Sequence, residues 1–277
     1  MKILKKKLLI TATAYPLPSR SYDELVCTAG IDENLNWFRI YPVPLKLITG
    51  LRENDKIQSF KYNWIEIEIK RRRGDMRPES YSLVSNDFSK IKIFNRIGPG
   101  NVWRERKKYC ISKIYNDIKI LINDSKAPQN KSLAVFKPKE IIDFIWEADE
   151  RDWKDEWKKI RKQDDLFEGK SPEIAIKKLP YKFFYKFKDD KGVVSKLSIE
   201  DWEIGALYWN CLKAAKNDEQ EALKKVKFKF YNEFVQKKDL YLFLGTTLEW
   251  HYRRAKNPFV IIGVFYPPKQ TQLELGF

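Results

Sequence analysis

Histidine and cysteine are scarce in this chain of 277 residues, and their scarcity excludes several kinds of site. His251 is the single histidine, so a site that needs two imidazoles, such as a histidine-rich metal centre, is excluded. The three cysteines, Cys27, Cys110 and Cys211, are widely spaced and form neither a disulfide framework nor a zinc-knuckle pattern. We therefore expect a reduced, cytoplasmic protein without a bound metal or cofactor.

Long apolar runs are also missing, and the mean hydropathy of the chain is -0.56. No stretch approaches the length of a membrane-spanning helix, so we expect no membrane partner. The start of the chain is basic and then apolar, but it reaches Tyr15-Pro16 without a cleavage site. It predicts a first β-strand rather than a signal peptide.

Positive charge and aromatic rings are what the chain has in excess. Lysine and arginine number 54 against 38 aspartate and glutamate residues, which gives a formal net charge of +16, and 14% of the residues are aromatic. Cations bind phosphate backbones through counterion release, and exposed rings stack on bases. The combination favours a nucleic-acid-binding protein. The alternative is a lysine-rich surface around an aromatic core.

The first hundred residues predict short strands bounded by Pro, Gly, Asn or Asp. The expected strands are residues 8–14, 24–31, 37–43 and 64–70. In the last of these, strict alternation places Trp64 and the glutamates on one face and the isoleucines on the other, as in a half-buried strand. Short strands with turn-rich connections favour a small barrel over a doubly wound parallel sheet.

The rest of the chain predicts helices and further strands, and the second half repeats the broad plan of the first. Helical patterns cover residues 101–123, 149–162, 199–216 and 218–234, and strands are expected at 132–136, 141–147, 181–188, 193–197, 240–244 and 259–266. We predict an α+β protein with two OB-like antiparallel β-barrel modules and inserted helices. The modules are expected at residues 1–165 and 172–277, with an exposed loop or linker at 162–172.

Three segments of the first half carry a resemblance to a known family. They are the small-residue strand from Leu25 to Ile31, the Trp-x-Arg strand from Trp37 to Pro44, and Arg77-Pro78-Glu79-Ser80-Tyr81. Over roughly residues 8–85 the chain resembles the prokaryotic dual OB-containing domain family, and the second half resembles a related uncharacterised group of prokaryotic proteins. The resemblance implies tandem five-stranded barrels that bind single strands, in replication, repair or defence against phage.

Basic groups beside aromatic residues form the candidate nucleic-acid-binding site. The largest runs from Lys70 to Arg77, where guanidinium groups suit phosphate oxygens. Rings such as Trp37 can stack on unpaired bases, although core packing is the alternative for them, as a solvated face is for the charge. The expected nucleic-acid-binding residues are Arg39, Tyr41, Arg71, Arg72, Arg73, Arg77, Tyr81, Arg104, Arg106, Lys107, His251, Arg253 and Arg254. DNA is favoured as the ligand, with RNA or a small nucleotide as alternatives.

A metal-dependent nuclease is the enzymatic alternative. Glu66, Glu68 and Lys70 lie on one face of a predicted strand, like the Glu-x-Lys half of such a site. An upstream carboxylate would complete Mg²⁺ ligation, and Asp55 is the nearest candidate. An exposed strand with alternating charge explains the same residues without chemistry, so we favour a non-catalytic protein.

Two short segments suggest a second alternative, an adaptor recruited to the sliding clamp. Both resemble the Gln-led peptides by which bacterial replication and repair proteins bind the clamp. An extended peptide of this kind places apolar side chains in a pocket while the glutamine makes orienting hydrogen bonds. The candidate partner-binding residues are Gln163, Leu166 and Phe167 in the first segment, and Gln272, Leu273, Leu275 and Phe277 in the second.

Overall fold

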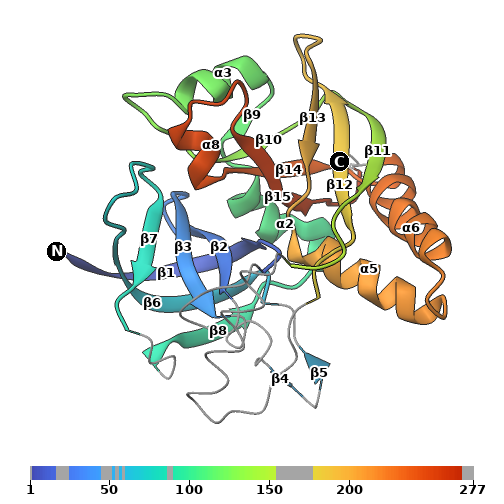
Figure 1. The fold of residues 1–277 in the computed structure, drawn as a ribbon. Coiled ribbons are helices and arrows are strands. Elements are labelled where there is room, and N and C mark those ends of the chain that lie inside the picture. The colour runs from blue at the N-terminus through green and yellow to red at the C-terminus, as the bar shows by residue number, and fades with distance from the viewer. Residues whose placement is uncertain are drawn as a thin grey trace, which may run out of the picture. The chain divides into compact units, whose positions relative to one another are not determined.

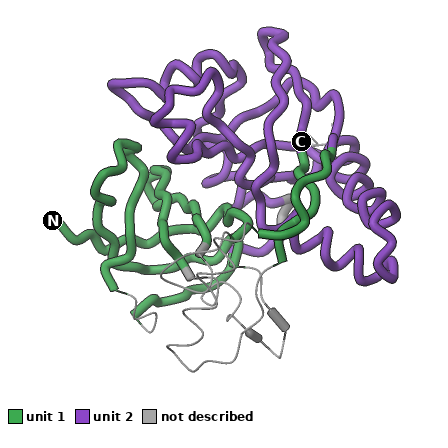
Figure 2. Tube along the Cα trace, viewed as in Figure 1, with its two compact units in different colours: residues 1–96, 146–183 green, residues 97–145, 184–277 purple. Residues whose placement is uncertain are grey.

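The chain divides into two compact units, as a computed structural model shows for residues 2–16, 25–44, 52–53, 56–57, 60–85, 90–153 and 177–269 (Figure 1). Unit 1 contains residues 1–96 and 146–183, and unit 2 contains residues 97–145 and 184–277 (Figure 2). These units differ from the expected modules at 1–165 and 172–277. The reason is pairing between distant strands, since β10 (Leu133–Phe136) pairs with β14 (Tyr241–Thr246). The expected linker at 162–172 lies outside the described residues.

Unit 1 is built around a closed barrel of five strands, in the order β1-β2-β3-β7-β6 with β6 pairing back to β1. The pairs are antiparallel except for β3 with β7, which are parallel. An additional strand, β8, extends the sheet from β6, and the short strands β4 and β5 pair with each other. The bounds are β1 (Ile3–Thr13), β2 (Leu25–Asp32), β3 (Trp37–Pro44), β4 (Arg52–Glu53), β5 (Lys56–Ile57), β6 (Asn63–Arg71), β7 (Ser80–Leu83) and β8 (Lys92–Arg96).

The alternation predicted for β6 is confirmed. Ile65, Ile67 and Ile69 are 0–4% exposed, whereas Glu68 between them is exposed. Their burial against β1 and the rest of the barrel fixes the register, because a slip by one residue would turn the isoleucines outward. A glycine also matters here: a Cβ on Gly30 of β2 would lie 3.0 Å from the carbonyl oxygen of Leu9 on β1. The Ala-Gly strand therefore allows two barrel strands to approach closely.

Unit 2 contains a four-stranded sheet, the described helices and the larger part of a three-stranded sheet, whose residues 146–148 and 181–183 are assigned to unit 1. The first sheet has the order β15-β14-β10-β9 and the second β11-β12-β13, and an isolated bridge joins Ile199 to Ile261. The bounds are α2 (Gly100–Cys110), β9 (Ile114–Tyr115), α3 (Ile118–Asp124), β11 (Glu140–Ala148), β12 (Tyr181–Lys188), β13 (Val194–Ser198), α5 (Trp202–Ala214), α6 (Glu219–Lys227), the π-helix η2 (Phe228–Glu233), α7 (Phe234–Lys237), α8 (Leu248–Tyr252) and β15 (Phe259–Phe265). Among the described strands, a closed barrel is thus found in unit 1, and the tandem arrangement is not seen.

Aromatic residues build the core of unit 2. Tyr185 of β12 is fully buried and donates its hydroxyl to the carbonyl oxygen of Phe230 at 2.6 Å, and burial raises its pKa well above the usual value. The ring of Phe144 packs on both residues. For these three rings, the alternative interpretation of the aromatic excess as core packing is therefore confirmed.

A buried aspartate organises the hairpin of β12 and β13, which was predicted at 181–188 and 193–197. Asp189 accepts hydrogen bonds from the backbone N–H groups of Lys191 and Val193 at 2.9 and 2.8 Å. Its other oxygen accepts from the backbone N–H of Ile118 at 3.0 Å. One carboxylate thereby fastens the hairpin turn to the start of α3.

Candidate nucleic-acid interface

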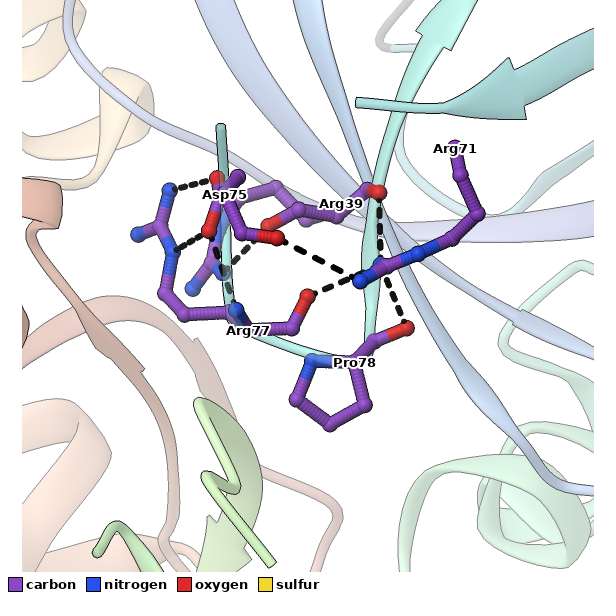
Figure 3. Close-up of polar contacts among 6 residues, drawn as sticks. Arg39, Arg71, Asp75, Arg77 and Pro78 are labelled. Carbon is purple, nitrogen blue, oxygen red and sulfur yellow. Dashed lines mark hydrogen bonds and ion pairs between the residues drawn. The ribbon is translucent and has the colours of Figure 1, made fainter. Parts of the chain in front are cut away.

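The last residue of β6 and the connection to β7 together hold four arginines, and we call residues 71–80 the arginine turn. Gly74 adopts φ +70°, which permits the sharp reversal of the chain. Arg71 donates from Nη1 to the carbonyl oxygens of Arg77, Pro78 and Ser80, each at 2.9 Å, and from Nη2 to that of Asp75 at 3.3 Å. Figure 3 shows this guanidinium at the centre of converging carbonyl groups. Arg71 is therefore a structural residue of the turn.

A buried ion pair closes the turn. Asp75 and Arg77 are 6% and 4% exposed, and Nη2 of Arg77 lies 2.6 Å from Oδ2 of Asp75. Oδ1 of Asp75 accepts from Nε and from the backbone N–H of Arg77 at 2.9 and 3.1 Å. Burial alone would raise the pKa of this carboxyl, but the hydrogen bonds and charge of Arg77 outweigh it and lower the pKa to about 2. The carboxylate stays ionised because its partner is fixed.

Arg39 lies beside this pair, inside unit 1. It is 3% exposed and donates from Nη1 to the hydroxyl of Ser80 at 3.3 Å. Burial lowers its pKa, and the neighbouring charge of Arg77 adds to the effect. The prediction that Arg39 and Arg77 contact phosphate as surface residues therefore disagrees with the structure, because strand alternation and turn packing direct both guanidinium groups inward.

The other cations of the arginine turn remain accessible. Arg73 is an exposed residue. Arg72 is half-buried, and its guanidinium carbon lies 4.6 Å from the centroid of the Tyr41 ring. The guanidinium carbon of Arg71 lies 5.4 Å from the centroid of the Tyr81 ring, and both rings are half-buried. The structure thus brings together five of the expected residues, Tyr41, Arg71, Arg72, Arg73 and Tyr81, within one part of unit 1.

The basic group of α2 belongs to unit 2, and it too contains both accessible and buried cations. Arg104 is exposed and Lys107 is half-buried, but Arg106 is 4% exposed and donates to the carbonyl oxygen of Ile97 at 2.9 Å. Its guanidinium carbon lies 4.7 Å from the centroid of the Trp103 ring, which itself packs on the buried Phe265 of β15. Arg106 is therefore a packing residue rather than the expected surface cation.

The third basic group lies at the C-terminal end of α8. His251 is 2% exposed, so it is buried rather than available to a ligand as predicted. Arg253 is exposed and forms an ion pair with Glu249 at 3.1 Å, and Arg254 donates to the side chain of Asn130 at 3.4 Å. His251 lies within α8 and is buried, whereas the two arginines follow its last residue, Tyr252, and are exposed.

The geometry of β6 bears on the nuclease alternative. Glu66 forms ion pairs with Lys5 at 2.9 Å and Lys92 at 3.9 Å, and Glu68 is exposed on the same face. Within the described residues no group of three or more His, Cys, Asp and Glu could hold a metal ion. The other proposed ligand, Asp55, lies outside the described residues, as do both Gln-led segments, 163–167 and 272–277.

A groove in unit 2 brings together cations that the sequence analysis did not single out. Its volume is about 990 Å³, and it is lined by α3, β13, Trp250 of α8 and the segment 255–260. We call it the lysine groove, because it is lined by Lys119, Lys126, Lys196 and Lys256. These four residues come from three distant segments, so no local pattern indicates that they share a surface.

The chain belongs to the family described as a domain of unknown function, DUF8757, which matches residues 100–276. A second family of unknown function, DUF8758, matches residues 4–112. The first match begins close to residue 97, where unit 2 begins. No curated protein matches the chain. No helix among the described residues is both long and apolar enough to cross a membrane.

Proposed function

We propose that unit 1 binds single-stranded nucleic acid, with DNA as the favoured ligand, through the arginine turn and the adjoining face of the barrel, as an OB-fold does. OB-folds are five-stranded barrels that bind oligonucleotides over their second and third strands and through the loops after the first and fourth. With the barrel strands counted along the chain, β6 is the fourth strand and β7 the fifth. The arginine turn is then the loop after the fourth strand. The proposal rests on the presence of these arginines in a loop that OB-folds use to bind their ligand.

The chemistry of the turn assigns different roles to its arginines. Arg73, and Arg72 above the Tyr41 ring, contact phosphates, and Tyr41 offers an aromatic face for stacking on a base. Arg71 and the pair of Asp75 with Arg77 hold the backbone in one conformation. A turn fixed in this way loses little entropy when a ligand binds.

The proposed activity is binding without catalysis. The resemblance of residues 8–85 to the dual OB-containing family supports it, and extends it to a role in replication, repair or defence against phage. Fold alone does not establish function, so the proposal depends on the side chains of the turn and not on the barrel by itself.

The proposal is tested with the variant Arg72→Gln/Arg73→Gln and a fluorescein-labelled oligothymidylate, followed by anisotropy. Loss of two phosphate contacts should weaken binding and reduce the slope of log K against log salt by about 1.4. The matched control is Lys90→Gln/Lys92→Gln, which removes the same charge from exposed residues at β8. Equal affinity and slope in the two variants would exclude the arginine turn as the binding site.

A second variant tests the ring. Tyr41→Ala should weaken binding by about 1–3 kcal/mol, the range for a stacked base, while Tyr41→Phe should keep most of the affinity. If both substitutions weaken binding equally, the hydroxyl rather than the aromatic face is responsible, and the stacking role is wrong.

A further inference from the structure

The lysine groove of unit 2 has an apolar lining and is open to solvent. Ile118 of α3, Leu197 of β13 and Phe259 of β15 contribute buried side chains to it, each at most 5% exposed. Its volume of about 990 Å³ lies at the top of the ~300–1,000 Å³ range of small-molecule pockets. An open groove of this size has room for part of a polymer.

The charge of the groove has one sign. All four of its lysines are exposed, and the described residues that line it include no Asp or Glu. Lys119 lies in the first turn of α3 and Lys126 follows the end of that helix, whereas Lys196 and Lys256 come from β13 and the segment before β15. The four cations therefore reach the groove from three separate segments of the chain.

Three carboxylates in or beside α3 and the β12–β13 turn accept hydrogen bonds from the backbone or from a hydroxyl group. Asp117 caps α3 by accepting from the backbone N–H of Lys119 at 2.8 Å, and Asp189 accepts from that of Ile118 at 3.0 Å. Asp124 accepts from the hydroxyl of Tyr115 at 2.8 Å. These oxygens accept hydrogen bonds from neutral groups and the carboxylates keep their charge, but none of the three acids is among the described residues that line the groove.

An aromatic ring also faces solvent at the groove. Trp250 is 47% exposed, although large rings are mostly buried. Its position is fixed, since α8 begins with a hydrogen bond from its backbone N–H to the hydroxyl of Thr247 at 3.2 Å and the next residue, His251, is buried. A second ring, Phe184, is half-buried in the lining, and Nζ of Lys196 lies 4.3 Å from its centroid.

We propose that the lysine groove is a second and separate site for single-stranded nucleic acid, in which the lysines neutralise phosphates and Trp250 stacks on a base. Four exposed cations suit a charged backbone, and an accessible ring suits unpaired bases, because every base has an aromatic face. An acidic peptide would use the charge but not the ring. The site stands on residues of unit 2 alone, whether or not the arginine turn binds a ligand.

The first test removes the charge of the groove in the full chain. The variant Lys119→Gln/Lys126→Gln/Lys196→Gln/Lys256→Gln is compared with Lys213→Gln/Lys224→Gln/Lys225→Gln/Lys237→Gln, which removes the same charge from exposed residues of α5, α6 and α7. With labelled oligothymidylate, the groove variant should bind at least about tenfold more weakly than the control. Its slope of log K against log salt should be shallower by about 3. Equal affinities would overturn the proposal.

The second test concerns the ring. Trp250→Ala should weaken binding by about fivefold to a hundredfold, and Trp250→Phe should retain most of the affinity. An oligonucleotide carrying iodouracil should also cross-link to the peptide that contains Trp250. Absence of both effects would show that Trp250 does not contact the strand and would overturn the assigned mode of binding.

A labelled polyglutamate peptide tests the alternative ligand, an acidic peptide. If it binds more tightly than the oligonucleotide, loses affinity in the groove variant and is unaffected by Trp250→Ala, the groove is a peptide site and the proposal is wrong. Arg72→Gln/Arg73→Gln is measured in parallel, so that failure of the groove and failure of the arginine turn give different results. Thermal unfolding checks that each variant is folded.

Discussion

The arginine turn of unit 1 and the lysine groove of unit 2 each contain four cations, but they use them differently. In the turn, Arg71 and Arg77 bind carbonyl groups and a carboxylate of the protein itself. In the groove, all four lysines are exposed. The planar guanidinium with its five donors suits fixed acceptors, whereas a hydrated ammonium on a flexible stem favours the surface. The number of cations in a segment therefore does not give the charge available to a ligand.

The largest loss of stability should come from breaking the ion pair of the arginine turn. Asp75→Asn keeps the size of the side chain but leaves Arg77 buried beside Arg39 without a carboxylate, and should lower the free energy of unfolding by about 3–5 kcal/mol. Urea unfolding measures it. Glu68→Gln, on the exposed face of β6, is the control and should change stability by less than about 0.5 kcal/mol. Similar losses in both variants would remove the distinction between structural and surface charge.

A smaller loss is expected for Arg71→Lys. An ammonium group keeps the charge, but it cannot reach all the carbonyl oxygens that the guanidinium joins, so the free energy of unfolding should fall by about 2 kcal/mol. The same substitution at Arg73, which is exposed, serves as the control. If the Arg71 and Arg73 variants are equally stable, the hydrogen bonds of Arg71 do not hold the turn.

The pH dependence of stability tests the same pair without changing its shape. The pKa of Asp75 falls from the ordinary 3.8 to about 2 on folding, so the carboxylate stabilises the folded state above pH 3.8. This contribution, about 2 kcal/mol, should disappear as the pH falls from near 4 toward 2. Asp75→Asn should lack this part of the acid transition. An identical pH profile in the wild type and the variant would contradict the assigned ion pair.

The smallest change in stability is expected for substitutions in the lysine groove. Replacing any one of its four lysines by Gln should change the free energy of unfolding by less than about 0.5 kcal/mol, because these side chains are exposed. The measurement is urea unfolding of the four single variants. A loss comparable to that of Arg71→Lys would mean that the lysines hold the fold, and that the two regions are alike.

Local patterns predicted much of the fold. The alternation of β6 and the hairpin of β12 and β13 depend on neighbouring residues, so they could be read directly. β7 was not predicted, because its four residues give little periodicity and its pairing with β3 is parallel and distant in sequence. Barrel closure depends on that strand, which only the folded structure places.

The site was harder to predict because burial depends on partners far along the chain. Arg39 reads as a surface cation until Ser80, which follows 41 residues later, accepts its hydrogen bond. His251 lies between exposed residues, and only the orientation of α8 shows that it is buried. Trp250 and the lysines of the groove meet through tertiary structure alone, so no spacing in the sequence could have indicated them.

The salt dependence of oligothymidylate binding by the unmodified chain tests the central claim most directly. Each phosphate contact with an exposed cation should contribute about -0.7 to the slope of log K against log salt. With Arg72, Arg73 and the lysine groove engaged, we predict a steep and linear decrease in affinity as salt is added. A flat titration, or no binding at low salt, would contradict the account of both sites.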